Sequence, residues 1–227
     1  SITRGPDELA GWKVAKLSDA DNARLSAERL VGPVFKSSVR NVESGGSTVM
    51  PVYEGGFAAV EAEFVLILGT DVPPSDKDWS DDELIAMVAG AHCGAEIASS
   101  PMAVVNERGP TSIVSDFGNN AGVIVGPEID DWSNKPVGFL TATVTVDDAV
   151  VGSKPVDAMV GSPLQALRFL IKVSGRRGIS LPAGTVVSSG AITGVHDVQT
   201  SSTARVDFGA FGWFDVSFEP RAPLDHS

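Results

Sequence analysis

Continuous apolar runs dominate the centre and the C-terminal half of the chain. These runs are rich in β-branched and aromatic residues and are bounded by Gly, Pro or Asp, a pattern typical of strands. We predict strands over residues 60–68, 121–125, 139–146, 184–189, 204–208 and 213–218. Asp147 and Asp148 mark the tip of a hairpin over residues 144–154, and residues 182–184 form a turn. The pattern therefore predicts a sheet-rich body.

Two segments carry signals for the start of a helix. The first opens with the capping-box sequence Ser80-Asp81-Asp82-Glu83 and continues with apolar residues at helical spacing, namely Leu84, Met87, Val88 and Ala91. In the second, Ser162 is expected to cap the helix and Pro163 to take its first position, where a missing N–H costs nothing. Gly175 is expected to end that helix.

Composition excludes several classes of protein. A hydrophobic content of 43% over 227 residues is enough for a large core, and we expect one domain over residues 1–227. The formal charge is 17 − 29 = −12 without a basic run, so nucleic acid is not an expected partner. Cys93 has no second cysteine to pair with, and the apolar runs are too short to span a membrane. The N-terminus lacks the apolar segment of a signal peptide, so we expect a cytoplasmic protein.

The segment Val60-Glu61-Ala62-Glu63-Phe64 carries the first candidate chemistry. Residues two apart in a strand point to the same face, so Glu61 and Glu63 would project together, about 7 Å apart, from an otherwise apolar run. Such a pair of like charges needs a partner if it is buried, and a divalent cation is the simplest one. The alternative is a solvated strand face, which the apolar flanks disfavour.

Glu96 is a candidate third ligand, because it also lies in an apolar stretch, just beyond the first predicted helix. Three carboxylates with water form a hard oxygen shell that suits Mg²⁺ or Mn²⁺ better than zinc. His92 and Cys93 adjoin the predicted helix end and His196 lies in a Gly-rich loop, so the sequence shows no His/Cys cluster typical of zinc.

Three further segments are candidate catalytic or binding elements. Lys13 is a cation among apolar neighbours, and it is either a group held for acid–base work or an ordinary surface lysine. The loops at residues 116–122 and 188–194 lie beside predicted strands and are rich in small and hydrogen-bonding residues. Asp116, Ser189, Gly190 and Thr193 are the candidate substrate-binding residues in these loops.

The order of several motifs resembles a known family. GWKVAKLS, GPVF, VEAEFVLILG, GAEIASS, DFGNNAGVIVG, GSPLQALRFL and AGTVVSSGAITG together resemble the 2-keto-4-pentenoate hydratase branch of the fumarylacetoacetate hydrolase superfamily, over residues 10–218. The spacing of 33 residues between the VEAE motif and Glu96 is the most specific part of the match.

The resemblance implies an α+β, mainly β fold with a mixed β-roll or barrel-like core and peripheral helices. It implies that Glu61, Glu63 and Glu96 bind Mg²⁺ or Mn²⁺, that Lys13 is catalytic, and that the substrate is a small 2-oxo acid. The expected function is that of a lyase working through a metal-stabilised enolate, either a hydratase of 2-keto-4-pentenoate type or the related decarboxylase. The resemblance also implies homo-oligomers and a complex with a related pathway enzyme. Trp132 and Trp213 are candidate interface residues, because we expect these aromatic side chains to be exposed.

This chain also departs from the family pattern. Leu30-Val31 stands before Gly32 where the family commonly has an acidic residue, and Ser99-Ser100-Pro101 replaces the Asp-Ser-Arg that follows the third ligand. Of the Asp-Asn-Ala-Ser loop, only Asp116 is kept. Lys13 has twelve residues before it, so we expect the family's N-terminal helical segment to be absent and the pocket to be more open.

Two alternative functions stay open at this point. A C–C bond hydrolase of acylpyruvates is disfavoured, because that branch uses a His-Glu pair near its N-terminus and no His precedes residue 92. A non-catalytic structural paralogue is favoured by the altered residues and disfavoured by the retained glutamates and Lys13.

Overall fold

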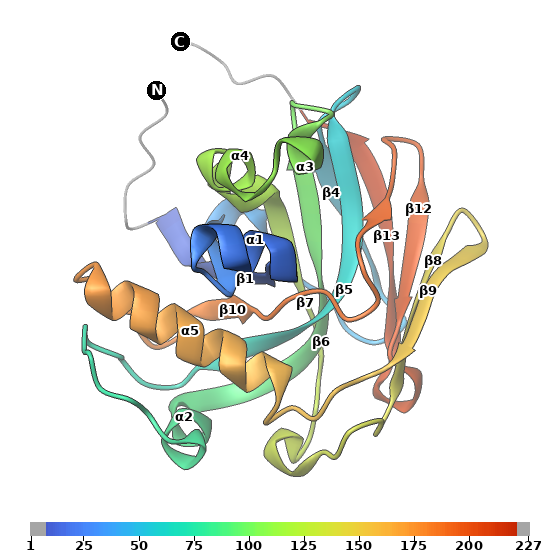
Figure 1. The fold of residues 1–227 in the computed structure, drawn as a ribbon. Coiled ribbons are helices and arrows are strands. Elements are labelled where there is room, and N and C mark those ends of the chain that lie inside the picture. The colour runs from blue at the N-terminus through green and yellow to red at the C-terminus, as the bar shows by residue number, and fades with distance from the viewer. Residues whose placement is uncertain (1–7, 222–227) are drawn as a thin grey trace.

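Two curled β-sheets form the body of the molecule in the computed structural model, which describes residues 8–221 (Figure 1). The larger sheet has the strand order β2-β1-β10-β5-β6-β7-β3, with β11 paired to β5, and the smaller has the order β4-β13-β12-β8-β9. The strands of the larger sheet are β1 (Leu9–Lys16), β2 (Arg29–Phe35), β3 (Val39–Asn41), β5 (Phe57–Leu68), β6 (Val88–Ser100), β7 (Asn120–Glu128), β10 (Val186–Ser188) and β11 (His196–Asp197). Those of the smaller sheet are β4 (Ser47–Val52), β8 (Thr141–Val146), β9 (Ala149–Pro155), β12 (Thr203–Asp207) and β13 (Trp213–Pro220). The expected mainly β fold is confirmed.

Helices lie at the periphery of these sheets (Figure 1). They are α1 (Asp19–Leu25), α2 (Asp81–Met87), α3 (Val105–Arg108), α4 (Pro110–Ser115) and α5 (Ser162–Arg176), with short 3₁₀ turns η2 (Lys36–Ser38), η3 (Phe117–Asn119), η4 (Trp132–Asn134) and η5 (Gly209–Phe211). The longest, α5, buries an apolar face that includes Leu164, Leu167 and Leu170. No helix among residues 8–221 has the length and apolar character needed to cross a membrane.

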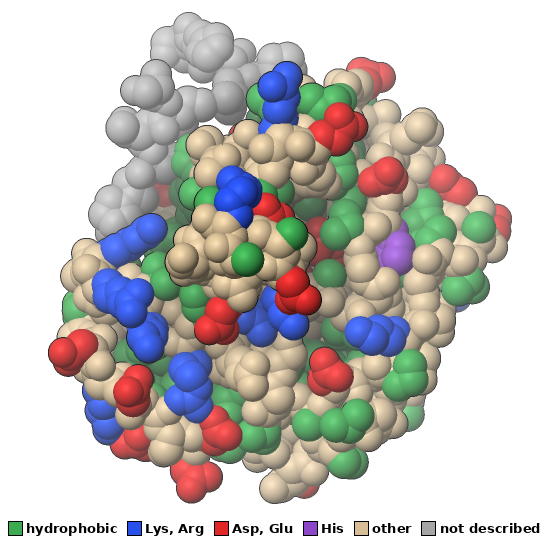
Figure 2. All heavy atoms as spheres, in the orientation of Figure 1, with side chains coloured by type: hydrophobic (Ala, Val, Ile, Leu, Met, Phe, Trp, Pro, Cys, Tyr) green, Lys and Arg blue, Asp and Glu red, His purple; other side chains and the backbone are tan. Residues whose placement is uncertain are grey.

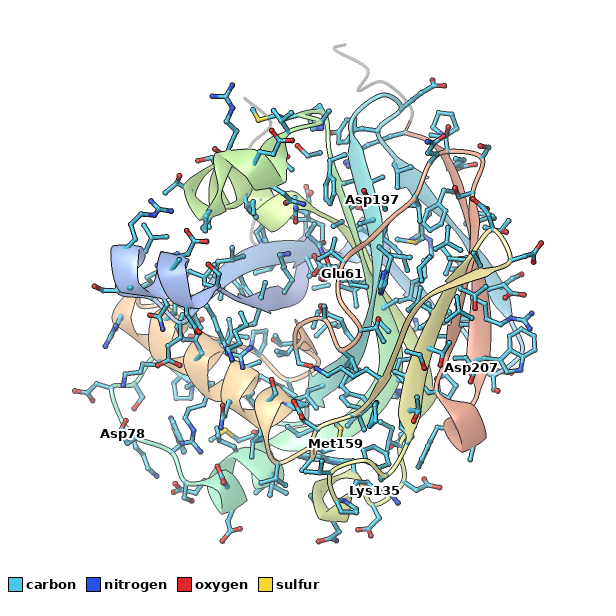
Figure 3. The ribbon with its side chains drawn as sticks, turned by 45° about the vertical axis from the view of Figure 1, so that its right-hand side comes forward. Glu61, Asp78, Lys135, Met159, Asp197 and Asp207 are labelled. Atoms are coloured by element: carbon cyan, nitrogen blue, oxygen red, sulfur yellow. The ribbon has the colours of Figure 1, made fainter. Side chains whose placement is uncertain are left out.

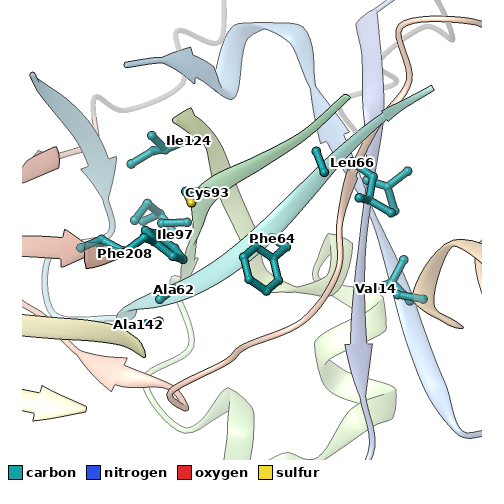
Figure 4. Close-up of a cluster of buried hydrophobic side chains, with 14 of the residues drawn as sticks. Val14, Ala62, Phe64, Leu66, Cys93, Ile97, Ile124, Ala142 and Phe208 are labelled. Atoms are coloured by element: carbon teal, nitrogen blue, oxygen red, sulfur yellow. The ribbon is translucent and has the colours of Figure 1, made fainter. Parts of the chain in front are cut away.

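Strand β5 contributes one face to the hydrophobic core and the other to a polar cluster. Ala62, Phe64 and Leu66 point into the core, where the ring of Phe64 lies 6.1 Å from that of Phe208 (Figure 4). Cys93 on β6 is opposite Phe64 in the register and is fully buried in the same core. The period of two in a strand then sends the side chains of odd-numbered β5 residues to the other face.

The six predicted strands are confirmed to within three residues at each end. The hairpin between β8 and β9 is confirmed as well, with positive φ of 46° at Asp147 and 65° at Asp148, as a two-residue hairpin turn requires. The sequence pattern did not indicate strands β1, β2, β3, β4, β6 and β11.

The first predicted helix is shorter than expected. Both hydrogen bonds of the capping box are formed, but α2 ends at Met87, and Val88 and Ala91 belong to β6. Strand β6 is hydrogen-bonded to β5 on one side and β7 on the other, so tertiary pairing overrides the helical spacing. Its small residues suit this position, because a Cβ at Gly94 would lie 2.4 Å from the carbonyl oxygen of Ile124.

The predicted ends of the second helix were wrong. Gly161 is the N-cap of α5, and Ser162 is its first helical residue and makes no side-chain cap. The helix runs through Gly175 to Arg176. Gly175 packs against the loop before α2, because a Cβ there would lie 2.1 Å from the carbonyl oxygen of Ser75.

The two aromatic residues expected at an interface, Trp132 and Trp213, pack against other residues of this chain. Trp132 is buried, with 9% of its surface exposed, and the guanidinium of Arg205 covers the ring of Trp213 at 3.8 Å. On the face shown in Figure 2, acidic and basic side chains are interspersed.

Candidate metal centre and substrate cavity

Glu61 and Glu63 project from the same face of β5 and are both buried. Figure 3 shows Glu61 near the middle of the molecule, far from the surface positions of Asp78 and Lys135. Glu61 is 7% exposed and Glu63 is 1% exposed, so the solvated strand face is excluded.

Glu96 joins them through the register of the β5–β6 pair. Glu61 and Glu96 are direct cross-strand partners, and such partners lie on the same face of a sheet. Each of the three glutamates offers a carboxylate oxygen, and these oxygens lie within 4.8 Å of one another. Sequence reasoning placed Glu96 after a helix, whereas it is β6 that brings it here.

Lys13 reaches the cluster from β1, which pairs with β10. Its Nζ lies 3.1 Å from Oε1 of Glu96 and donates to Oδ1 of Asn119 at 3.3 Å. The side chain is buried, with the whole residue 3% exposed, so the ordinary surface lysine is excluded. Space for it exists because residue 118 is a glycine, where a Cβ would lie 3.0 Å from Cε of Lys13.

Neighbouring polar groups fix the orientation of the carboxylates. Oε2 of Glu63 accepts hydrogen bonds from Oγ of Ser188 and, at 3.0 Å, from the backbone N–H of Gly190. Asn120 donates to Oε1 of Glu96 at 2.9 Å. Among residues 8–221, no hydrogen-bond donor contacts the other oxygen of Glu63 or the carboxylate of Glu61, so these oxygens are free to bind an ion.

The electrostatics of the cluster show the cost of burying three acids together. Burial raises the pKa of Glu61 to about 8, the charge of Glu96 adds to this effect, and Lys13 opposes it. Burial and the charges of Glu96 and Glu61 likewise raise the pKa of Glu63 well above its usual range. Burial alone would lower the pKa of Lys13, but the three carboxylates outweigh it and the pKa is raised.

The donor set fits a divalent cation. Three carboxylates and one ammonium carry a net charge of −2 when all are ionised, and a divalent ion brings that to zero. All the donors are oxygens, which Mg²⁺ and Mn²⁺ prefer over the nitrogen and sulfur ligands of zinc. Among the described residues, no other three His, Cys, Asp or Glu side chains bring their ligand atoms this close together.

A cavity of about 480 Å³ opens onto this cluster. Its lining includes Lys13, Glu61, Asn119, Ser189 and Gly190, together with residues of α1, α4 and the loop before α5. Glu61 is the glutamate of the cluster that lines it. The cavity is therefore large enough for a small organic acid that also reaches the carboxylates.

Two of the predicted substrate-binding residues lie elsewhere. Asp116 lines a neighbouring cavity together with Phe117 and Asn120, and Thr193 hydrogen-bonds to Nε2 of His196 at 3.0 Å. Asn119 and Asn120, from the same loop as Asp116, make the contacts to Lys13 and Glu96 instead. The loop bends through positive φ at Phe117, Gly118 and Asn119, a path that the sequence did not reveal.

The residues that depart from the family pattern have local roles. Leu30 lines the cavity as an apolar group. Ser99 donates to the carbonyl oxygen of Phe57 at 2.8 Å and accepts from the N–H of Tyr53 at 3.0 Å. Ser100 accepts from the N–H of Met102. Both serines therefore satisfy backbone groups where β6 ends.

Comparison with known proteins agrees with this geometry. The chain is 25% identical over 212 residues to a 2-keto-4-pentenoate hydratase of Paraburkholderia phymatum, covering 93% of this chain and 79% of that protein. It is 24% identical over 220 residues to a 4-oxalocrotonate decarboxylase of a Pseudomonas species, covering 95% of this chain and 80% of that protein.

Solved structures show the same fold. The 4-oxalocrotonate decarboxylase of Pseudomonas putida G7, complexed with magnesium and adipate, superposes with a TM-score of 0.74 at 20% identity, over 92% of this chain and 78% of that one. The fumarylpyruvate hydrolase of Pseudomonas aeruginosa, in complex with Mn²⁺ and pyruvate, gives a TM-score of 0.64 at 13% identity, over 92% of this chain and 89% of that one. The family model for the fumarylacetoacetate (FAA) hydrolase C-terminal region matches residues 17–216. The chain thus belongs to the fumarylacetoacetate hydrolase C-terminal family.

Proposed function

We propose that the protein is a divalent-metal-dependent lyase that converts a small 2-oxo acid through its enolate. The observation that carries this proposal is the buried cluster of Glu61, Glu63 and Glu96 with Lys13, at the inner end of a cavity. The relatives named hydratase and decarboxylase support the reaction class.

The three glutamates would hold Mg²⁺ or Mn²⁺, which supplies Lewis-acid stabilisation for negative charge on the oxygen of the 2-oxo group. Asn120 and Ser188 keep two of these carboxylates in place, so that little reorganisation is needed when substrate binds. The low exposure of the three glutamates also limits the access of water to the cluster.

Lys13 is the residue we assign to proton transfer. Its Nζ is protonated and is held between Glu96 and Asn119, so it can stabilise an enolate oxygen or give a proton to the developing carbanion. In a hydratase, the elements of water then add across the distal double bond. In a decarboxylase, CO₂ would leave from the far end of the substrate, and the electron pair of the broken C–C bond would pass along the conjugated chain to the oxygen of the 2-oxo group, which then takes a proton.

The experiment combines metal binding with turnover. Metal-free protein is titrated with Mn²⁺ by electron paramagnetic resonance, and turnover of 2-hydroxypenta-2,4-dienoate and 4-oxalocrotonate is followed by ultraviolet absorbance with and without EDTA. We expect Mn²⁺ binding and EDTA-sensitive turnover of at least one substrate. Turnover that persists in excess EDTA contradicts the proposal, and Mn²⁺ binding without turnover of any 2-oxo acid in a wider panel indicates a non-catalytic protein.

Two variants separate the roles of the ligands and the lysine. Glu96→Gln should weaken Mn²⁺ binding and abolish turnover together. Lys13→Met should retain Mn²⁺ and lower kcat by about 10²- to 10⁴-fold, because it removes the ammonium group that we assign to the reaction and keeps all three carboxylates. Glu219→Gln, an exposed position on β13, is the matched control and should change neither property. Circular dichroism checks that each variant folds.

A further inference from the structure

A second buried cation, Arg29, lines the same cavity and has no role in the proposed reaction. Arg29 begins β2 and is only 7% exposed. Its Nη2 donates to Oγ of Ser162 at 3.3 Å and to the backbone oxygen of the same residue at 3.5 Å. Its Nη1 is buried without a hydrogen-bond partner. A buried guanidinium nitrogen without a hydrogen-bond acceptor destabilises the folded protein. Because this nitrogen lies beside a cavity, a ligand bound in the cavity can supply the acceptor.

Among the described residues no acidic side chain forms a hydrogen bond with Arg29, although the charges of Glu28 and Glu63 act on it and oppose the lowering of its pKa by burial. None of the ion pairs found among residues 8–221 includes Arg29. Two aspartates line the cavity with it, but Asp21 is bound to Arg24 at 2.8 Å, and Asp157 is exposed. The guanidinium group of an arginine stays charged in proteins, so Arg29 keeps its positive charge.

The register of β1 and β2 adds a second cation beside the first. Lys16 is the direct cross-strand partner of Arg29, and both residues line the cavity. Like charges directly opposite one another destabilise a strand pair unless an anion lies between them. Lys16 is exposed and adds positive charge to the cavity, whereas the unpaired buried nitrogen of Arg29 is the feature that points to a missing anion.

Gly190 sets the distance between Arg29 and the carboxylate cluster. Its N–H donates to Oε2 of Glu63 at 3.0 Å, and a Cβ built on it would lie 3.8 Å from Nη1 of Arg29. The guanidinium is therefore within about 9 Å of the Glu63 carboxylate. Gly190 has a φ of 107°, which other residues rarely adopt, so this position keeps the space beside Arg29 free of a side chain.

We propose that Arg29 binds a second carboxylate, at the end of the substrate remote from the 2-oxo group, and so selects 2-oxo dicarboxylates over monocarboxylates. This inference rests on the proposed function for the position of the 2-oxo end, at Glu61, Glu63 and Glu96. The upper limit of about 9 Å admits a dicarboxylate with up to about four carbons between its carboxyl groups. The planar fork of an arginine matches a carboxylate with two parallel hydrogen bonds, and Ser162 holds the fork in place.

The test compares two inert probes of equal chain length, adipate and hexanoate. Each is titrated by calorimetry into the protein in Mg²⁺ and, separately, in EDTA. We expect adipate to bind about 10- to 100-fold more tightly than hexanoate, the range for a hydrogen-bonded charged group. Arg29→Met should remove this preference by weakening adipate alone, and it should leave Mn²⁺ binding unchanged.

Arg205→Met is the matched control. It removes the same charge from the opposite sheet, where Arg205 pairs with Asp215 on the surface, and it should keep the preference for adipate. If Arg29→Met does not fold, Arg29→Lys decides, because it keeps the charge and loses the fork. It should weaken adipate at least threefold with hexanoate unchanged, and unaltered adipate binding by this variant overturns the inference.

The outcomes separate this inference from the proposed function. Wild-type protein that binds Mn²⁺ and turns over a 2-oxo acid but shows no preference for adipate overturns the inference alone. Retention of the preference by Arg29→Met, or loss of Mn²⁺ binding in that variant, overturns it as well. Failure of the wild-type protein to bind Mn²⁺ overturns the proposed function, whatever the adipate titration shows.

Discussion

The buried carboxylates predict that the metal-free protein loses stability as the pH rises from 5 to 8. The pKa of Glu61 is raised from 4.5 to about 8 in the folded state by burial and by Glu96. Between these values the unfolded chain has released its proton while the folded protein retains it. The folded state therefore binds more protons, and the free energy of unfolding falls with increasing pH.

The magnitude follows from the same two values. For Glu61 alone, the linkage gives a loss of about 3 to 4 kcal/mol between pH 5 and pH 8. The raised pKa of Glu63 acts in the same direction. His196 acts in the opposite direction, because burial lowers its pKa, and so it does not account for a decrease. A loss of this size is a large part of the stability of an ordinary domain.

Urea unfolding followed by tryptophan fluorescence measures this effect in EDTA and in Mn²⁺. Since metal binding requires ionised carboxylates, Mn²⁺ should stabilise the protein more at pH 8 than at pH 5 and so oppose the decrease. Glu61→Gln is the matched variant, because it keeps the shape of the side chain and removes its titration. Metal-free protein that is as stable at pH 8 as at pH 5, or an equal slope in Glu61→Gln, would falsify the reasoning.

Two substitutions test the packing on either side of β5. Gly118→Ala should destabilise the protein by about 1 to 3 kcal/mol, because the residue has a φ of 75° and a Cβ would lie 2.9 Å from Cα of Gly32. The same substitution should lower turnover by displacing Lys13. Thermal unfolding measures the first effect and steady-state kinetics the second. Phe64→Ala should cost about 3 to 5 kcal/mol, since the ring is buried against Phe208. A cost below 1 kcal/mol in urea unfolding would contradict that packing.

The parts of the fold that were predicted are those where side-chain shape alone favours a strand. β-Branched and aromatic runs identified β5, β7, β8, β12 and β13, because such residues fit a pleated, half-buried surface. Strand β6 was missed because its Gly and Ala residues carry little strand signal. Those small residues are needed where β6 is enclosed by β5 and β7, which is a property of the tertiary structure.

The candidate site was predictable where it depends on local geometry. The period of two placed Glu61 and Glu63 on one face, and burial of the apolar flanks followed from it. The facing position of Glu96 depends on the β5–β6 register, and the contacts of Asn119, Asn120 and Ser188 depend on loops and strands more than 20 residues away. Arg29 gave no signal, since one arginine before an apolar run is ordinary until its neighbours are known.

Cys93 gives this protein a built-in reporter for the strand that carries Glu96. It is the only cysteine in the chain, its side chain is fully buried in the hydrophobic core, and burial raises the pKa of its thiol. A thiol reagent therefore reacts only when β6 separates from its neighbours, and the labelling rate measures the free energy of that opening. A ligand that couples β5 to β6 through their facing carboxylates slows the labelling, so occupancy of the cluster can be followed without any substrate.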